Sequence, residues 1–494
     1  MKRCAYILVA LMLFNMACSL TGSLGELFNA GASPESEGRC GDGVCDGPEN
    51  EQKCPEDCSE DAQESREDTS SSKKRNGEFA ILYQLTENTI TSYDMSGDTC
   101  YALNFTRYHD AGLVNADGSG NLPLDLKDNP TSIVTAANDD AYYYISTPVD
   151  PVSQMMGMSM FNWDVEGQTL YASDFGTGSP AQFARLPQGA FPGGVAAAPG
   201  GQHVLYLSTV QSSPKQSQPG AMMNSSFNPY LNDSSLIIAD ANGSGAQEVL
   251  SQSFNRQLFT SFADYSASGD NLFTIARQGS GFEFVRISLS SGDVAGFSQV
   301  FPKFDWAQLN WEEFFPRAED FAFASFAISP DEKTMIAYKN IFTANMQNVC
   351  VTEASHHLWV FDLQGGDVQK FADQPGYVSD STWHPDGSNF ALAIVGNAGC
   401  YPDYFDAQID VFAENGQKKD TLLTEAKSKI TNIGWSPDGD GIAYDVYSTD
   451  YVGFIKTVDV SSKKVSEVIS TSELGISVDN KTPLLFLFTG WVDA

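Results

Sequence analysis

The sequence predicts an all-β protein whose main domain repeats a four-stranded antiparallel unit. The composition is rich in Gly (42 residues) and aromatic residues (12%) and only 18% charged, which favours short strands and tight turns over helical bundles. Three segments also share one pattern, in which an apolar and a polar residue precede Pro-Asp and an apolar strand follows. They are ISPDEKTMIAY (328–338), WHPDGSNFALA (383–393) and WSPDGDGIAY (435–444).

The chain is strongly acidic, with 63 Asp+Glu against 28 Lys+Arg and a formal net charge of −35. Binding to nucleic-acid phosphates needs clustered Lys and Arg. The basic run Lys73-Lys74-Arg75 lies inside an otherwise acidic segment. The composition therefore argues against a nucleic-acid partner, and its 42% of hydrophobic residues is enough for a sizeable core.

Residues 1–17 have the pattern of a secretory signal peptide. Two basic residues precede an apolar run from Ala5 to Phe14, which is too short to be interpreted first as a membrane span. The mature chain is therefore expected to be extracytoplasmic, where disulfides are permitted.

The end of this run resembles the cleavage site of bacterial lipoproteins, because the small residue Ala17 directly precedes Cys18. Asn15 departs from the family pattern, which has an apolar residue there. The resemblance implies that Cys18 becomes the lipidated first residue of a membrane-anchored lipoprotein of the bacterial cell envelope. The alternative is ordinary secretory cleavage near Ala17, which leaves a soluble secreted protein.

A small, polar spacer (18–39) leads into a Cys-rich module, CGDGVCDGPENEQKCPEDC (40–58). Its cysteines are Cys40, Cys45, Cys54 and Cys58. So short a segment cannot bury a core, and we expect two disulfides, whose pairing the sequence does not determine. Zinc is disfavoured because no His is close and C-x2-C pairs are lacking.

A second interpretation of the module adds calcium as a ligand. Four acidic residues offer hard oxygen ligands: Asp42, Asp46, Glu49 and Asp57. The segment resembles short Cys/Asp-rich modules of secreted bacterial proteins and, more loosely, the calcium-binding repeats of Notch-type receptors. The disulfide staple without a required cofactor is the preferred interpretation. Residues 59–77 are polar and charged, and we expect them to form a disordered acidic linker.

The rest of the chain, 78–494, is predicted to be a repeat domain. Pro fixes φ at each turn entry, Asp hydrogen-bonds its own backbone and Gly accepts positive φ, so the flanking runs pair as a hairpin. Weaker copies of the turn and strand occur at 135–146, 196–208 and 264–276. A second hairpin follows each copy, as at 235–250, 357–372 and 407–423. One unit is therefore four antiparallel strands, A to D.

Such units, with a Pro-Asp-Gly turn between strands A and B, resemble the TolB-type β-propeller repeats, which are relatives of WD-repeat blades. The resemblance covers about residues 78–494 and implies a ring of blades. Turn positions near 137, 199, 267, 330, 385 and 437, together with the chain end, predict seven blades, with six or eight as alternatives. The small α/β domain that precedes the TolB propeller has no counterpart here, which puts a role in a Tol–Pal system in doubt.

The two ends of the repeat domain are predicted to complete one blade together. FAILYQL (79–85), TITSYDM (89–95) and DTCYALNF (98–105) match strands B, C and D, whereas LLFLFTGWVDA (484–494) matches strand A. Pairing them closes the ring and removes an open sheet edge.

The residues that recur in the repeats have structural explanations. The repeated Pro and Asp residues of the turns are expected to be turn formers. The repeated tryptophans are expected to pack between neighbouring blades: Trp383, Trp435 and Trp491.

The loops of a propeller divide between two faces, with A–B and C–D turns on one and B–C and D–A connections on the other. The A–B turns are short here, and the long insertions are predicted to be D–A loops at 104–130, 174–192 and 299–319 and B–C loops at 210–233, 340–355 and 396–406. Because binding residues tend to sit on loops of a rigid scaffold, this second face is the predicted working surface.

Two of these insertions carry cysteines. Cys350 and Cys400 lie in B–C loops of neighbouring blades, and we predict a disulfide between them. Cys100 is left over on the predicted outer strand D of blade 1, where we expect a thiol.

The insertion at 299–319 is rich in aromatic and acidic residues and has two interpretations. It forms a short amphipathic helix that caps the channel mouth, or it is a recognition patch with Trp306 and Trp311 as anchors for a peptide or sugar. In the insertion at 396–406, Tyr401 and Asp403 are candidates to rim a pocket, although they are equally explained as solvated loop residues.

The sequence lacks the G-x-S-x-G, H-E-x-x-H and P-loop signatures. His356 and His357 are adjacent on a predicted strand and point to opposite faces, so both cannot serve one metal. We therefore expect a binding or scaffold protein for a protein or saccharide ligand. The alternative is a cation-dependent hydrolase or lyase, lactonase-like, with ligands at the channel mouth such as Asp305, Glu312, Glu353 and Asp403. Three or more carboxylates converging on the channel axis would favour that enzyme.

Overall fold

The computed structural model of the chain describes part of residues 79–493. The described ranges are 79–95, 98–126, 130–135, 141–146, 169–175, 180–185, 190–199, 201–210, 231–255, 264–278, 281–306, 322–344, 351–371, 373–396, 406–448, 452–474 and 484–493. Contacts divide the chain between Arg75 and Asn76, and all of these ranges belong to the second unit. The predicted signal, Cys18, the Cys-rich module and the acidic linker lie outside the described residues.

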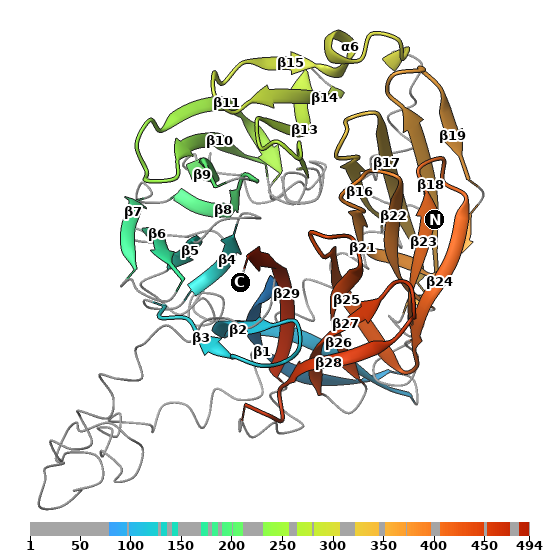
Figure 1. The fold of residues 1–494 in the computed structure, drawn as a ribbon. Helices are drawn as coiled ribbons and strands as arrows, with labels where there is room; N and C mark the ends of the chain where they lie inside the picture. Colours follow the sequence, from blue (N-terminus) through green and yellow to red (C-terminus); the bar gives the residue numbers. More distant parts are fainter. Residues whose placement is uncertain are drawn as a thin grey trace, which may run out of the picture. The chain divides into compact units, whose positions relative to one another are not determined.

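Seven antiparallel sheets follow one another around a common axis, so the domain is a seven-bladed β-propeller (Figure 1). The fold class and blade number predicted from the repeats are confirmed. The first strands of most neighbouring blades contact one another around the centre of the ring. Within the described ranges the only α-helix is α6 (Phe297–Val300).

Blades 2 to 7 take their strands in chain order, from A to D. Blade 2 is β4 (Pro130–Thr135), β5 (Ala141–Ser146), β6 (Thr169–Asp174) and β7 (Ala181–Arg185), and blade 3 is β8 (Ala190–Ala197), β9 (His203–Val210), β10 (Leu231–Asp240) and β11 (Gln247–Asn255). Blade 4 is β12 (Asp264–Tyr265), β13 (Asn271–Gln278), β14 (Gly281–Ser288) and β15 (Val294–Gly296). Blade 5 is β16 (Ala322–Ile328), β17 (Thr334–Ala344), β18 (Val351–Asp362) and β19 (Val368–Lys370), with β20 (Gln374–Pro375) added beside β18. Blade 6 is β21 (Tyr377–Trp383), β22 (Asn389–Val395), β23 (Ala407–Ala413) and β24 (Lys418–Glu425), and blade 7 is β25 (Ser428–Trp435), β26 (Gly441–Ser448), β27 (Gly453–Asp459) and β28 (Val465–Ser470).

Blade 1 closes the ring, as predicted, by joining the two ends of the domain. Its strand A is β29 (Leu484–Asp493), which pairs antiparallel with β1 (Phe79–Met95) from Phe79↔Asp493 to Glu87↔Leu484. The Thr86 hydroxyl adds a hydrogen bond to the Leu485 carbonyl at 3.3 Å. The ring is therefore closed by main-chain pairing between β29 and β1 along most of β29.

The strands predicted for the rest of blade 1 were partly wrong. TITSYDM and DTCYALNF are not strands C and D, because β1 and β2 (Asp98–Asn115) form one long hairpin in which these segments pair with each other, as in Ile90↔Leu103. Strand C is the later part of β2, and strand D is the short β3 (Leu122–Pro123). Cys100, opposite Tyr93, accordingly lies near the hairpin tip and not on the outer strand.

Three predicted insertions also proved to contain strand. The segment 104–130 holds the end of β2 and β3, and 174–192 holds β7 and the start of β8. At 340–355, β17 and β18 continue past the blade and leave only 345–350 between them.

Apolar side chains fill the spaces between neighbouring blades. Trp383 packs with residues of blades 5 and 6, Trp435 with blades 6 and 7, and Trp491 with blades 7 and 1. Each of the three is less than a tenth exposed, so their predicted packing role is confirmed. The indole Nε1 of Trp491 also donates to the Gly434 carbonyl at 3.0 Å.

Candidate functional site

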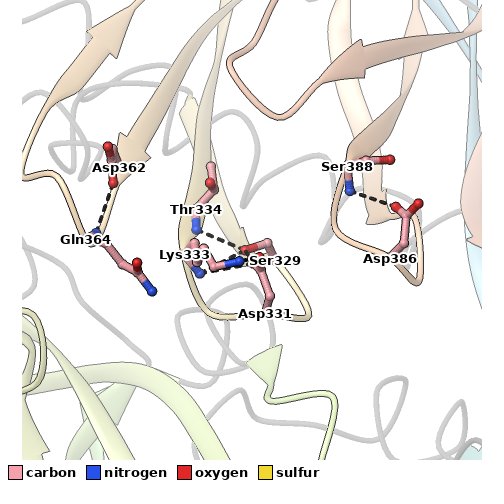
Figure 2. Close-up of polar contacts among 8 residues, drawn as sticks. All are labelled: Ser329, Asp331, Lys333, Thr334, Asp362, Gln364, Asp386 and Ser388. Atoms are coloured by element: carbon pink, nitrogen blue, oxygen red, sulfur yellow. Dashed lines mark hydrogen bonds and ion pairs between the residues drawn. The ribbon is translucent and has the colours of Figure 1, made fainter.

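We call the face with the A–B and C–D turns the turn face, and the opposite face, with the B–C and D–A connections, the loop-bearing face. The A–B turns are held by their own side chains (Figure 2). Asp331 accepts a hydrogen bond from the Ser329 hydroxyl at 2.8 Å, and Asp386 accepts one from the Ser388 amide at 2.8 Å. The contacts from Ser388, together with His384, lower the pKa of Asp386 to about 2. The predicted turn-forming role of these aspartates is confirmed.

Successive A–B turns also nest on one another through glycine. Gly269 and Gly439 have φ of 73° and 78°, values that side chains rarely adopt. A Cβ on Gly269 would lie 1.9 Å from the carbonyl oxygen of Pro199 in blade 3, and one on Gly439 would lie 2.3 Å from Nε2 of His384 in blade 6. At these two positions the turns pack so closely that a residue larger than glycine would collide with the preceding blade.

A polar cleft of about 530 Å³ opens on the turn face between blades 5 and 6. Two of its charged side chains, those of Lys333 and Asp362, make hydrogen bonds within the turns. Lys333 donates to Asp331 at 2.5 Å, and Asp362 accepts from the Gln364 amide at 3.0 Å (Figure 2). Asp362 also accepts from the Gly365 amide at 2.5 Å. We therefore interpret the cleft as a consequence of turn packing.

The loop-bearing face is built differently. The β1–β2 and β17–β18 hairpins run on beyond the blades toward it. Several connections on this face lie outside the described residues, at 147–168, 211–230, 307–321, 397–405 and 475–483. Long connections on this face contrast with the short turns of the other.

Polar side chains link blades 4 to 7 and blade 1 to one another. Asp264 accepts from the Ile328 amide of the next blade at 2.5 Å, and Asp380 accepts from the Ile433 amide at 2.8 Å. Between blades 5 and 6 the link is Asn340, whose amide group binds both the N–H and the carbonyl of Val378, at 2.8 and 2.7 Å.

The last link joins blade 7 to the closing strand. Asp445 accepts from the Phe488 amide at 2.8 Å and from the Thr431 amide at 2.9 Å. In blades 6, 7 and 1 the linked strand A has a bulge, at which the regular ladder leaves backbone groups unpaired. These side chains therefore supply partners that the sheet does not.

Burial changes the acidity of the linking carboxyls. It raises the pKa of Asp264 to about 6 and that of Asp380 to about 7, although backbone N–H donors oppose the shift in both. Nearby Asp445 raises the pKa of Asp380 further. Burial raises the pKa of Asp445 as well. The sequence analysis missed these residues, whose signal was a single Asp within an otherwise apolar or small-residue strand.

A lysine and two tyrosines gather at the loop-bearing end of blades 6 and 7. Lys429 lies opposite Tyr447 in the β25–β26 register, and Tyr377 begins β21 of the preceding blade. The Lys429 Nζ lies 5.9 Å from the centroid of each tyrosine ring. Burial lowers the pKa of Lys429, but the two tyrosines outweigh it and hold that pKa above its ordinary value.

Of the predicted ligand-binding residues, the structure describes Trp306. It is 8% exposed and packs against Phe297 and Phe361, and its Nε1 donates to the Phe301 carbonyl at 3.0 Å. The side chain thus fills the core between blades 4 and 5 and offers no anchor to a ligand. Trp311, Tyr401 and Asp403 lie outside the described residues, as do Cys350 and Cys400.

The carboxylates expected of a cation-dependent enzyme are not brought together in the described part of the chain. Asp305 is exposed beside Trp306, Glu353 lies in β18 opposite Thr343, and Glu312 is not described. Within the described ranges no group of three or more His, Cys, Asp or Glu is placed to hold a metal ion. His356 is buried and its Nδ1 contacts the Gly376 carbonyl at 2.9 Å, whereas the Nδ1 of His357 lies 2.9 Å from Asp373.

No helix among the described residues has the length and apolar character needed to cross a membrane.

No protein-family model matches the chain, and no curated protein matches it. Among solved structures, the chain is similar to an oligogalacturonate lyase in complex with manganese (15% identity, 55% of this chain and 63% of that one, TM-score 0.37). It is also similar to the tricorn protease (10% identity, 83% and 36%, TM-score 0.45) and to TolB from Acinetobacter baumannii (12% identity, 82% and 82%, TM-score 0.35). The chain spans less than two thirds of the lyase and about a third of the tricorn protease. None of these similarities assigns a ligand or an activity to the chain.

Proposed function

We propose that the chain is an exported binding protein that holds a protein or saccharide partner on the loop-bearing face of its propeller. The supporting observation is the asymmetry of the ring. The turns of one face pack on the preceding blade, and their Asp and Ser groups form hydrogen bonds within the turns. The other face carries the long connections, on strands that extend beyond the blades. A rigid scaffold with variable loops on one side is the usual arrangement of a binding surface.

The amino-terminal part supports the proposed location. A signal-like segment before Cys18 favours export and lipid anchoring, and the cysteines of 40–58 favour a stapled module on an acidic linker. Metabolic labelling with palmitate tests the anchor. Label is expected on the wild-type chain and not on Cys18→Ser. An unlabelled wild-type chain would contradict lipid anchoring and favour the alternative, a secreted soluble protein.

A capture experiment with two matched variants tests the binding face. In the first variant an Asn-Gly turn replaces residues 88–106, which joins Glu87 to Arg107 and removes the distal β1–β2 hairpin while keeping the blade strands. In the second, alanine replaces Gln364, Gln369 and Asn415 in the turn-face cleft. Both are compared with the wild type in pull-downs from bacterial envelope extracts.

We expect the same partner to be captured by the wild type and the turn-face variant and to be reduced with the trimmed hairpin. Loss of the partner only in the turn-face variant would move the binding surface to the cleft. Metal-dependent turnover of small esters or glycosidic substrates, abolished by chelation, would favour the alternative of a propeller enzyme.

A further inference from the structure

We propose that Lys429, Tyr377 and Tyr447 form a site that binds a single carboxylate group of a ligand. This inference rests on the proposed function, because it gives the loop-bearing face a chemical preference. The site joins two blades, since Tyr377 belongs to β21 and the other two residues belong to β25 and β26.

The position of the three residues makes the site accessible from the loop-bearing face. Tyr377 and Lys429 are at the starts of their A strands, directly after D–A connections. Tyr447 is the last residue but one of β26, before the B–C connection. All three are half-buried, so a small group can reach them while most of the bulk water is kept away. In such surroundings a charge-assisted hydrogen bond is stronger than at an open surface.

The cluster supplies donors that suit a carboxylate. A lysine ammonium has three N–H donors and no acceptor, and a tyrosine hydroxyl can donate one hydrogen bond. Lys429 and Tyr447, which lie opposite one another on β25 and β26, provide one donor of each kind. Two donors and one positive charge match a carboxylate, which has two oxygens and one negative charge.

The Lys429 ammonium has no carboxylate partner among the described residues. Lys418 and Lys463 lie 2.7 Å from carboxylates, and Lys456, which is similarly shielded, lies 2.9 Å from Glu425. No carboxylate of the described residues lies within 4 Å of the Lys429 ammonium. The two tyrosines favour the charged ammonium, and a ligand carboxylate would add a partner of opposite charge.

The surrounding charge favours a monoanion over a phosphate. Asp445 is close enough to Tyr447 to act on it electrostatically, and the whole chain carries −35. One ammonium offsets a single negative charge, whereas a dianion would meet uncompensated repulsion. A sugar acid and the carboxyl terminus of a peptide both supply the required group.

The test uses calorimetric titration and thermal unfolding of the purified full chain at constant ionic strength. The probes are D-glucuronate for sugar acids and N-acetyl-dialanine for peptide carboxyl termini, with D-glucuronamide and N-acetyl-dialanine amide as uncharged counterparts. The variants are Lys429→Met, Tyr447→Phe and, as a control with the same loss of charge on the turn face, Lys464→Met.

We expect at least one carboxylate probe to bind the wild type and Lys464→Met, and its amide counterpart not to bind. Tyr447→Phe should weaken binding by about tenfold or more, and Lys429→Met should abolish it. The probe that binds identifies the source of the carboxylate. If Lys429→Met does not fold, the comparison of Tyr447→Phe with the wild type decides.

The inference is overturned if neither carboxylate binds the wild type, or if the variants bind it as the wild type does. The proposed function is judged separately, by capture of the envelope partner. A Lys429→Met chain that loses the probe and keeps the partner supports the carboxylate site and places the main contact on the loops. A wild type that captures the partner and binds no carboxylate retains the proposed function and removes this inference.

Discussion

A single polar side chain connects each of several blades to the next. Some of these side chains are carboxylates and one is a neutral amide. Asp264 and Asp380 accept from a backbone amide of the following blade, and Asn340 makes the equivalent link with a neutral amide group. The negative charge is therefore not needed for the link itself. What the carboxylates add is a dependence on pH, because burial raises the pKa of each above its ordinary range.

We predict that the Asp380 carboxyl makes the protein less stable as pH rises. Its pKa is about 7 in the folded chain and 3.8 ordinarily, so between these values the folded state binds more protons than the unfolded state. Its contribution to the free energy of unfolding is then greatest below pH 4 and is lost as pH rises through 7. The stability difference between wild type and Asp380→Asn should fall by on the order of 4 kcal/mol across this window. Urea unfolding at a series of pH values measures it, and a pH-independent difference would contradict the assignment.

The nested turns lead to a second prediction at single-residue scale. Gly439→Ala should lower the free energy of unfolding by on the order of 2 kcal/mol, because φ is 78° and the new Cβ would collide with His384. Gly441→Ala is the matched control, since its Cβ would find its nearest neighbour, the Val458 carbonyl, at 3.4 Å. The control should change stability by less than about 0.5 kcal/mol. Equal effects in urea unfolding would show that the turn tolerates a side chain.

The connector from blade 4 to blade 5 shows how an element can be misjudged from its composition. A recognition patch was one of two interpretations of its aromatic residues, yet Phe297, Phe304 and Trp306 are all buried. Because β15 is only three residues long, the connector completes the core between these blades. Aromatic content alone does not distinguish core from binding surface.

We expect Trp306→Ala to destabilise the protein by about 3–5 kcal/mol, as large-to-small changes in a core do, without altering capture of the partner. Lys303→Ala, at an exposed position of the same connector, should stay within about 0.5 kcal/mol of the wild type. Chemical denaturation measures both. A stable Trp306→Ala chain that has lost its partner would restore the tryptophan as a ligand anchor.

The sequence predicted the repeated elements well where turn chemistry marked them. The Pro-Asp turns and the Gly-rich C–D turns located most hairpins of blades 2 to 7, and β29 was recognised because LLFLFTGWVDA matches strand A. The strand pairing of blade 1 was harder to predict. A segment with alternating residues, such as TITSYDM, indicates a strand but does not indicate which strand it pairs with. The same limit hid the site: Lys429, Tyr377 and Tyr447 lie far apart in sequence and meet only because β21 and β25 are neighbouring inner strands.

At the scale of the molecule, stability depends on closing the ring. Strand β29 pairs with β1 and contributes Phe486, Phe488 and Trp491 to the core between blades 7 and 1. The interactions that hold it are made between residues some 400 positions apart, such as Thr86 and Leu485 (|i−j| = 399). Loss of this strand exposes an apolar core and an unpaired sheet edge at once.

We therefore predict that deleting residues 484–494 abolishes cooperative thermal unfolding of the purified chain and promotes aggregation. Deleting residues 1–75, a separate unit, should leave the melting temperature of the propeller unchanged. Scanning calorimetry distinguishes the two variants. A carboxyl-terminal truncation that melts like the wild type would show that six blades suffice for stability.

The pairing of Phe79 with Asp493 also determines at which face the polypeptide chain enters and leaves the propeller. Strand B begins, and strand A ends, at the turn face, so both ends of the described domain emerge there. The polypeptide that precedes Phe79 therefore joins the propeller at the turn face, the face opposite the long connections.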